Sequence, residues 1–212
     1  MASTETLFDL SAFDHYSLFK DTRFVWEGIL KLKGYMSQLR LGNIACDIPE
    51  GVTLVNPEAI SIGAGTVIER GSYIEGPCMI GENCVLRHGS YIRPFVLTGN
   101  HCVIGHGREI KHSIFLNRAQ APHFNYVGDS ILGNGVNIGA GVICANYRLD
   151  GKEIPVVVND KRFSTGVNKL GSFIGDYSQI GCNCVVNPGV ILRKKTLSKA
   201  CQSLQESNLR DV

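Results

Sequence analysis

The chain has 212 residues, and its 21 lysines and arginines against 19 aspartates and glutamates give a formal net charge of +2. So small a charge argues against a nucleic-acid-binding protein or a membrane-surface protein. No apolar run approaches the roughly 18 residues that a membrane span needs, and the first ten residues lack the basic and apolar segments of a secretory signal. We therefore expect a cytoplasmic protein whose eight cysteines are free thiols, with no metal site.

Residues 1–43 predict a short N-terminal helical cap. An apolar stripe with alternating spacings of four and three residues indicates a helix between Asp21 and Gly42. The stripe consists of Val25, Ile29, Leu32, Met36 and Leu39. An earlier apolar cluster, between Phe8 and Phe19, indicates one more helix. We expect these helices to cover the open end of the repeat region that follows, where strand edges would lie unpaired. A partner-docking helix is the alternative.

Residues 44–194 carry a hexapeptide repeat. Aliphatic residues recur at every sixth position, and glycine often follows them. The first series breaks only at Thr98, and its members are Ile62, Ile68, Ile74, Ile80, Leu86, Ile92, Ile104, Ile110 and Leu116. The later series are Leu132 and Ile138, then Ile174, Ile180, Val186 and Leu192. A period of six is neither helical nor a simple strand alternation. It predicts an all-β solenoid with three short flat faces per coil.

The fourth position after each aliphatic residue is small or β-branched, and we expect it to point inward near a tight corner of the coil. Cysteine occupies this position at Cys78, Cys84, Cys102 and Cys184. Free cysteine behaves as a small buried hydrophobe. These four thiols are therefore expected to be inert.

The repeat is lost over 148–171, which predicts an extended loop thrown out of the solenoid. A strand-like run at 154–158 is followed by the turn pair Asn159 and Asp160, so the loop is expected to contain a hairpin. Loops on a rigid scaffold often carry functional residues. The remaining residues, 195–212, are polar and predict a helix or a frayed tail.

Residues 87–147 hold most of the candidate chemistry, including five of the six histidines. The stretch RAQAPHFNYVGDS in this segment reads as a departure from the repeat. Asparagine and tyrosine supply directional hydrogen bonds, arginine and lysine hold phosphate, and histidine is a general base near neutral pH. The candidates are Arg93, Lys111, His123, Tyr126, Asn137, Asn146 and Tyr147. This set suits an anionic, sugar-like substrate with a protonatable group, although a lone histidine in a solenoid is more often a turn residue.

The block from His123 to Tyr147, with its pattern H-x-x-Y…N-I-G-A-G…N-Y, resembles the acetyltransferase domain of bifunctional N-acetylglucosamine-1-phosphate uridyltransferases. The following stretch, LDGKEIPVVV…TGVNKLGSFIGD, is more similar to archaeal-type sugar-1-phosphate nucleotidyltransferase/acetyltransferases. The resemblance covers roughly residues 44–192. It implies a left-handed parallel β-helix and a homotrimer with active sites between subunits.

The resemblance also implies residue roles. His123 matches the general base, and Asn146 matches the residue near the reacting acetyl group. Arg93 and Lys111 match the residues that hold the sugar phosphate. The remaining sugar-site matches are Tyr126, Asn137, Tyr147 and the loop residue Lys152. A second loop lysine of the archaeal type corresponds to Pro155 here.

The implied reaction is acetyl-CoA-dependent N-acetylation of an amino-sugar phosphate such as glucosamine 1-phosphate, in UDP-N-acetylglucosamine biosynthesis. Arg193 and Lys194 can meet the phosphates of coenzyme A, or they form a solvated basic turn. The 43 residues before the repeat are too few for a uridyltransferase domain, so no nucleotidyl transfer is expected.

Other functions remain open at this point. An acyl-carrier-protein-dependent acyltransferase of lipid A type uses the same fold and a catalytic histidine. A γ-class carbonic anhydrase also uses it, and His101 and His106 have the spacing of two zinc ligands. The position of the third ligand corresponds to Gly65, however. A solenoid scaffold without activity is the non-enzymatic alternative, and in such a scaffold His123 would be dispensable.

Overall fold

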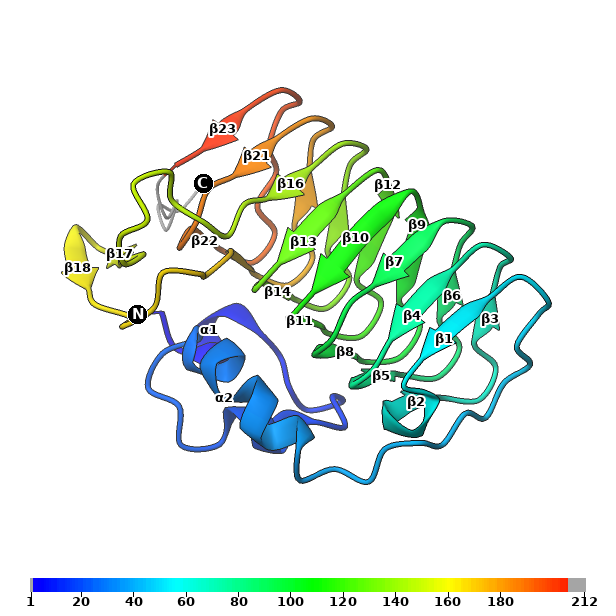
Figure 1. Cartoon of the computed structure of the whole chain (residues 1–212). Coiled ribbons are helices and arrows are strands. Elements are labelled where there is room, and N and C mark those ends of the chain that lie inside the picture. The colour runs from blue at the N-terminus through cyan, green and yellow to red at the C-terminus, as the bar shows by residue number, and fades with distance from the viewer. Residues whose placement is uncertain (1, 206–212) are drawn as a thin grey trace.

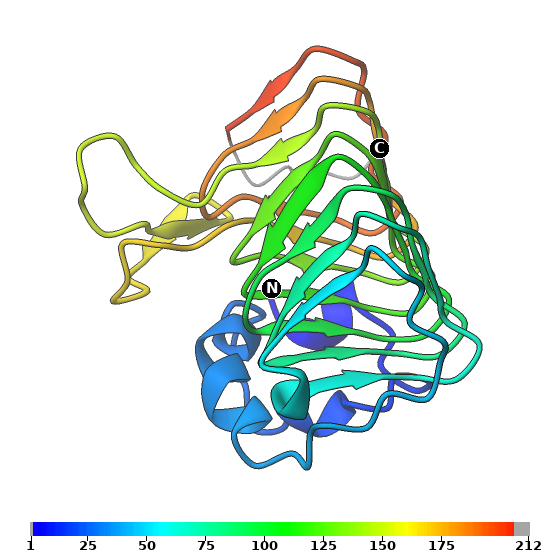
Figure 2. The same ribbon diagram turned by 45° about the vertical axis from the view of Figure 1, so that its right-hand side comes forward.

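The computed structural model describes residues 2–205 and shows a left-handed parallel β-helix with a triangular cross-section (Figures 1 and 2). Each coil contributes one strand to each of three parallel sheets, here named face 1, face 2 and face 3 in chain order. Face 1 contains β1 (Thr53–Val55), β4 (Tyr73–Glu75), β7 (Ser90–Ile92), β10 (Arg108–Lys111), β13 (Tyr126–Gly128), β16 (Ile143–Cys144), β21 (Val185–Val186) and β23 (Ser203–Leu204). Face 1 is turned toward the viewer in Figure 1, and no other segment lies in front of it.

The other two faces are built in the same way. Face 2 contains β2 (Ile60–Ile62), β5 (Cys78–Ile80), β8 (Val96–Thr98), β11 (Ser113–Phe115), β14 (Ile131–Leu132), β19 (Phe173–Ile174) and β22 (Ile191–Leu192). Face 3 contains β3 (Val67–Ile68), β6 (Val85–Leu86), β9 (Val103–His106), β12 (Gln120–His123), β15 (Asn137–Ile138) and β20 (Gln179–Ile180).

The repeat positions stack into the core as expected. One continuous cluster inside the prism contains the aliphatic series, and the four predicted inward cysteines are no more than 2% exposed. The register joins equivalent positions 18 residues apart in the regular coils, for example Ile74 with Ile92. Three hexapeptides therefore make one coil.

The inward series slips by one residue in the middle of the chain, which corrects the sequence interpretation. Phe115, not Leu116, pairs with Thr98 and with Leu132, so the steps from Ile110 to Phe115 and from Val127 to Leu132 are five residues long. Leu116 is buried instead on the outer side of face 2.

The stretch at 118–130 is consequently not an interruption of the solenoid. It forms the consecutive strands β12 on face 3 and β13 on face 1, with Ala121 and Val127 in the core. The five-residue step from Ile110 to Phe115 could not be recognised in the sequence, because residues 115 and 116 are both large and apolar.

The N-terminal segment forms helices, but they lie along a lateral face rather than over the open end. It contains α1 (Thr4–Leu7), the 3₁₀ helix η1 (Tyr16–Phe19) and α2 (Glu27–Met36), while a further 3₁₀ helix, η2 (Pro57–Ala59), belongs to the solenoid. Figure 2 shows the N-terminal helices against one side of the triangle. They bury the apolar outer side chains of face 2, which are Leu97, Ile114, Leu116, Ile131, Phe173 and Ile191. A surface with apolar residues on both sides of its strands requires such a cover.

The predicted loop and tail also take defined positions. The loop leaves the solenoid between β16 and β19 and contains the expected hairpin, β17 (Val156–Val158) paired antiparallel with β18 (Lys161–Phe163).

The tail continues the solenoid: Leu197 bridges Gln179, and β23 pairs with β21. The prediction of a helix or a frayed tail is therefore wrong for residues 195–205, where Ser198 occupies the aliphatic position between Leu192 and Leu204. Residues 206–212 of that tail lie outside the described part of the chain. The helices within 2–205 are too short to traverse a bilayer.

Candidate active site

The corner between faces 1 and 2, here the first corner, brings together residues from successive coils. It is one residue shorter in the two coils that carry the five-residue steps, and the backbone turns there at His112 (φ 43°) and Asp129 (φ 48°), both in the left-handed region. The next coil replaces this corner with the long loop that follows β16. The shortened turns place Lys111, His112 and Asp129 next to the base of that loop.

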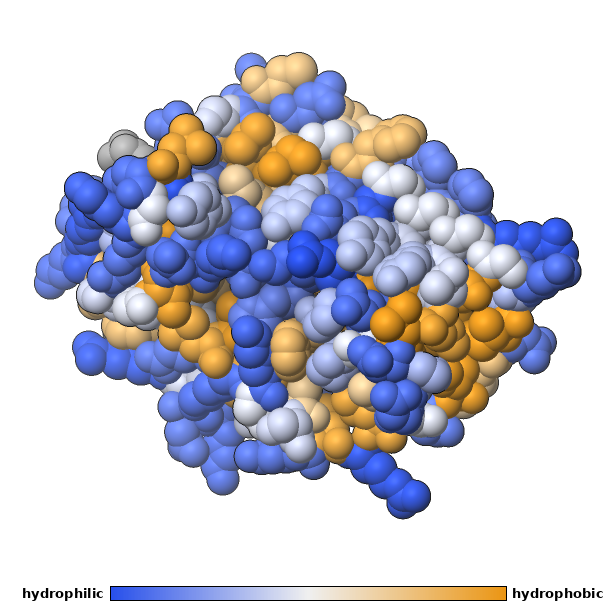
Figure 3. Space-filling model, viewed as in Figure 1, coloured by the Kyte–Doolittle hydropathy of each residue, from blue (hydrophilic) through white to orange (hydrophobic). Residues whose placement is uncertain are grey.

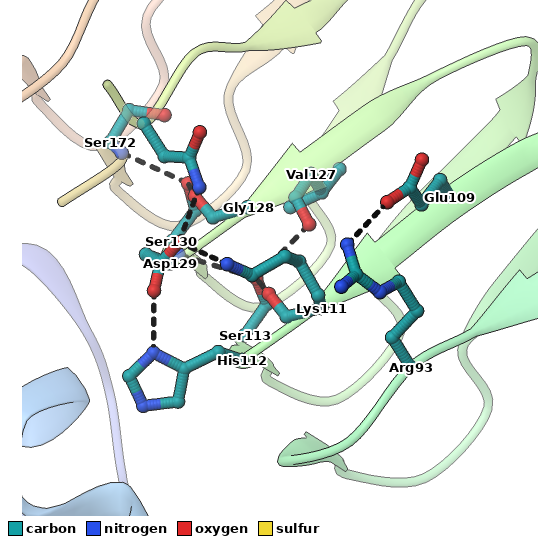
Figure 4. Close-up of polar contacts among 11 residues, drawn as sticks. Arg93, Glu109, Lys111, His112, Ser113, Val127, Gly128, Asp129, Ser130 and Ser172 are labelled. Carbon is teal, nitrogen blue, oxygen red and sulfur yellow. Dashed lines mark hydrogen bonds and ion pairs between the residues drawn. The ribbon is translucent and has the colours of Figure 1, made fainter. Parts of the chain in front are cut away.

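Asp129 is the centre of this cluster. Its carboxylate accepts a hydrogen bond from His112 Nδ1 at 2.6 Å, lies 3.3 Å from Lys111 Nζ and accepts a hydrogen bond from Asn146 Nδ2. Figure 4 shows the His112 and Lys111 side chains directed at Asp129. Burial acts to raise the pKa of Asp129, but the hydrogen bonds from His112 and Asn146 and the charge of Lys111 outweigh it, and the pKa lies below its ordinary value. The carboxylate is therefore ionised at neutral pH.

Tyr126 and Asn146 meet above Gly128 in β13. A Cβ atom at residue 128 would lie 2.6 Å from Tyr126 Oη and 2.7 Å from Asn146 Nδ2, so these two polar groups occupy the space that a side chain would fill. Burial raises the pKa of Tyr126, and the charges of Asp129 and Glu109 add to the effect. The phenol is thus a neutral hydrogen-bonding group beside the Asn146 amide.

Arg93 lies on the same face, where it pairs with Glu109. Its Nη1 lies 2.7 Å from Glu109 Oε1, and this hydrogen bond raises the pKa of Arg93 above its ordinary value. Figure 4 shows this pair beside the Asp129 cluster. In the space-filling view, polar side chains gather where β10 and β13 end, with apolar side chains over β16 and β21 (Figure 3).

A groove of about 480 Å³ opens at the first corner. The solenoid forms one wall, and the opposite wall comes from α2 and the end of the loop. Its lining includes Leu30, Lys33, Arg93, Pro94, Phe95, Lys111, His112, Asp129, Val167, Asn168 and Lys169. The predicted phosphate-binding residues Arg93 and Lys111 therefore share one cavity.

The predicted base lies apart from this cluster. His123 is exposed at the end of β12, at the corner between faces 3 and 1, and its backbone N–H donates to Asn125 Oδ1 at 3.2 Å. Asn137 lies on face 3, in register with Gln120 and Gln179. Within residues 2–205, no side-chain hydrogen bond or ion pair joins either residue to the Asp129 cluster. A single chain thus presents the predicted residues in two groups, on two faces.

The predicted residues Tyr147 and Lys152 are not among the residues that line the groove. Tyr147 is exposed, and its backbone bridges Lys169 at the base of the loop. Lys152 lines a separate cavity of about 410 Å³ with Arg148 and Arg162, and its N–H donates to Asp150 Oδ1. The structure therefore places Lys152 outside the groove that holds Arg93.

The predicted coenzyme-binding residues, Arg193 and Lys194, follow β22 on another corner. Lys194 Nζ lies 3.6 Å from Asp176 Oδ2, and Asp176 also accepts a hydrogen bond from the backbone N–H of Asp9. Lys194 therefore forms an ion pair with the same carboxylate that binds the N-terminal segment to the solenoid.

The histidines of the zinc alternative are also separated. His101 comes before β9, whereas His106 ends it, so the two occupy different corners of the coil. Within residues 2–205 no group of three metal-ligating side chains is close enough to hold an ion.

Sequence reasoning missed Asp129, His112, Glu109, Lys33 and Lys169. The signal for the first two was the pair of five-residue steps, which shortens the first corner. The two lysines gave no signal, because only the docking of α2 and the loop brings them to the groove.

Comparison with known proteins identifies the family of the chain. The model of a family described as the GMPPB C-terminal domain matches residues 74–206, well over half of the chain. This chain belongs to that family. The match includes both shortened corners and the loop that follows β16, whereas α2, which supplies Leu30 and Lys33 to the groove, lies outside it.

Curated relatives match a shorter part of the chain. A bifunctional sugar-1-phosphate nucleotidylyltransferase/acetyltransferase from Sulfurisphaera tokodaii is 46% identical over 82 residues, 39% of this chain and 20% of that protein. A bifunctional protein GlmU from Methanocaldococcus jannaschii is 42% identical over 82 residues, with the same shares. An uncharacterized acetyltransferase, YaiX, from Escherichia coli (strain K12) is 36% identical over 137 residues, 65% of this chain and 60% of that protein. The matches to the first two relatives span about a fifth of their length.

Proposed function

We propose that this chain is an acyltransferase that transfers the acetyl group of acetyl-CoA to the amine of an amino-sugar phosphate. The observation that carries the proposal is that Arg93 and Lys111 line one groove, whose wall residue Asp129 holds Asn146 beside Tyr126. These groups offer cations for a phosphate and neutral hydrogen-bonding groups for sugar hydroxyls. The acetyltransferase names of the relatives support the same chemistry.

The reaction requires a base, and His123 is proposed for this role. An ammonium has no lone pair, so the sugar amine must lose a proton before its nitrogen attacks the thioester carbonyl. The imidazole accepts this proton, the carbon–nitrogen bond forms and the carbon–sulfur bond breaks, and the thiolate of coenzyme A takes up the second proton, which the new amide nitrogen loses. Such base catalysis contributes a factor of about 10²–10⁴ in rate.

Asn146 is proposed to stabilise the oxyanion of the tetrahedral intermediate. One N–H of its amide donates to Asp129, which fixes the orientation of the group. The amide is also hydrogen-bonded to Tyr126, and the substrate oxygen is proposed to replace the Tyr126 hydroxyl at the second N–H. A donor held in place before the reaction stabilises the developing charge without reorganisation.

The division of the site between two faces supports a homotrimer. Face 2 is covered by the N-terminal segment of the same chain, whereas faces 1 and 3 carry the two separated groups of site residues. Packing face 1 of one chain beside the His123 corner of its neighbour would complete each site. Closed symmetry of this kind repeats the same contact around the ring.

Replacement of His123 tests the proposal. We expect His123→Ala to lower kcat by about 10²-fold or more with a smaller effect on KM, measured with acetyl-CoA and a panel of amino-sugar phosphates. His88→Ala, an exposed histidine on the same corner two coils earlier, is the matched control and retains full activity. Acetylation of no amino sugar by the wild-type protein, or full activity of His123→Ala, would refute the assignment. Activity only with acyl-carrier-protein thioesters would favour the lipid A type of acyltransferase.

A further inference from the structure

The groove at the first corner contains more positive charge than the two predicted phosphate ligands explain. Four of its lining residues carry a full positive charge, namely Lys33, Arg93, Lys111 and Lys169. They come from three parts of the chain: the solenoid, α2 of the N-terminal segment and the base of the loop. The sequence resemblance assigned a role only to Arg93 and Lys111.

Both of those cations already have carboxylate partners. Arg93 pairs with Glu109 at 2.7 Å, and Lys111 lies 3.3 Å from the buried carboxylate of Asp129. Each pair sums to zero net charge, and a bound phosphate would lie near both carboxylates. Arg93 and Lys111 alone therefore provide hydrogen-bond donors but no excess positive charge.

Lys33 and Lys169 supply that excess. Neither forms an ion pair with a carboxylate of residues 2–205. Lys33 Nζ lies 5.1 Å from the centre of the Phe95 ring, a cation–π contact that positions the ammonium and leaves its charge uncompensated. Phe95 is in turn in edge contact with His112, so the contact belongs to the wall of the groove.

Both lysines stand on backbone that the fold holds in place. Lys33 is on α2, whose Ile29, Leu32 and Met36 are no more than 1% exposed against face 2. The backbone of Lys169 bridges Tyr147, and the next N–H, that of Leu170, donates to the carbonyl of Asn146 at 3.0 Å. The position of Lys169 is thus tied to the strand end that carries the proposed oxyanion donor.

We propose that Lys33 and Lys169 bind the phosphate of the acceptor from the side opposite Arg93 and Lys111. The inference rests on the proposed function for the identity of the acceptor, but the anion site itself follows from the charges in the groove. The N-terminal segment is then part of the substrate site as well as a cover for face 2. The two lysines select acceptors whose sugar carries an anionic ester over the same sugars without one.

The test removes each charge while keeping the length of the side chain. Lys33→Met, Lys169→Met and the double variant are compared with Lys20→Met and Lys161→Met, exposed lysines of the same two segments that do not line the groove. Glucosamine 1-phosphate is titrated calorimetrically, and KM and kcat are measured with acetyl-CoA for glucosamine 1-phosphate and for unphosphorylated glucosamine. Lys33→Arg tests whether a cation alone is enough.

We expect each charge removal to weaken glucosamine 1-phosphate binding by about tenfold, the value of one charged contact, with kcat nearly unchanged. The affinity for unphosphorylated glucosamine stays as in the wild type, and Lys33→Arg recovers most of the binding. Unchanged glucosamine 1-phosphate binding in the double variant, or equal weakening for both sugars, would overturn the inference.

Binding and activity separate this inference from the proposed function. If the wild-type protein binds glucosamine 1-phosphate through Lys33 and Lys169 but transfers no acetyl group, the anion site stands and the proposed function fails. If it transfers acetyl groups and the double variant behaves like the wild type, the function stands and this inference fails. Absence of both binding and transfer in the wild type overturns both.

Discussion

Asp129 connects side chains from three successive coils. Lys111 and His112 come from the coil before it, and Asn146 comes from the coil after it. A buried carboxylate is costly unless hydrogen bonds and opposite charge compensate it. Its partners here satisfy both conditions, and in return the carboxylate orients the Lys111 ammonium and the Asn146 amide at the groove. Asp129 is therefore a positioning residue.

The cysteines differ in exposure, which leads to a prediction at the same scale. Burial raises the pKa of Cys78 to about 12 and that of Cys144 to about 11, and Cys84, Cys102 and Cys184 are buried beside them in the core. The thiolate is the reactive form, so the raised pKa protects Cys78 and Cys144. The hydrogen bond from Cys102 lowers the pKa of Cys84 to about 7, so Cys84 is protected by its burial alone. All five thiols are expected to resist alkylation in the folded protein. Mass spectrometry after a short iodoacetamide pulse at pH 8 should find label on the exposed Cys182 and Cys201.

All eight cysteines should react after denaturation, which provides the internal control. Rapid labelling of the buried thiols in the native state would mean that the inward register is wrong, because a slip of one residue turns each side chain outward.

At the level of secondary-structure elements, α2 packs on face 2 and makes one especially close contact with η1. A Cβ atom at Gly28 would lie 2.5 Å from Cε1 of Phe19, and the Phe19 ring is itself buried in the N-terminal cluster. Only glycine allows the helix to approach η1 so closely. Gly34, on the same helix, faces open space, with no atom within 4 Å of its Cβ position.

These two glycines form a matched pair for a stability measurement. Gly28→Ala is expected to destabilise the fold, because overpacking costs about 1–3 kcal/mol and outweighs the gain in helix propensity. Gly34→Ala is expected to stabilise it by about 0.5–1 kcal/mol. Urea unfolding of the two variants and the wild type measures both effects. Equal midpoints for the two alanine variants would show that α2 is not packed against η1 in solution.

At the scale of the whole molecule, the three faces have different surroundings. Face 2 is sealed by the N-terminal segment, while apolar side chains stay exposed on face 1, such as Tyr91 and Val185, and on face 3, such as Val67. Exposed apolar surface on a regular scaffold favours assembly. The same faces carry the two groups of site residues, so assembly and completion of the site are expected together.

Light scattering at micromolar concentration is expected to give a mass of three times 23.1 kDa. Val185→Glu places a charge on face 1 and should dissociate the trimer and abolish activity. Val157→Glu is the matched control, because Val157 is similarly exposed (40% against 37%) but lies on the hairpin. A monomeric wild-type protein with full activity would contradict the shared site.

The solenoid, the inward cysteines and the hairpin at 156–163 could be predicted from the amino-acid sequence. Each of these depends on residues close together in the chain, because the hexapeptide period sets the direction of every side chain within one coil. The motif from His123 to Tyr147 drew attention to Tyr126 and Asn146, and the family resemblance added Arg93 and Lys111, but the other charged residues of the groove were missed. The sequence did not reveal the slip after Ile110, since Phe115 and Leu116 both satisfy an apolar count.

Three features could not be predicted from the sequence, because they depend on tertiary contacts. They are the docking site of the N-terminal helices, the extent of the last coil and the set of side chains that meet at the first corner. The stripe on α2 shows that the helix must bury one side, but an apolar stripe fits any apolar surface and does not name face 2. Asp129, Lys33 and Lys169 are distant in sequence or lack a repeat position, so their meeting depends on the corner geometry and on that docking. The division of the predicted site between faces 1 and 3 has the same origin, because it arises from the closed triangular coil.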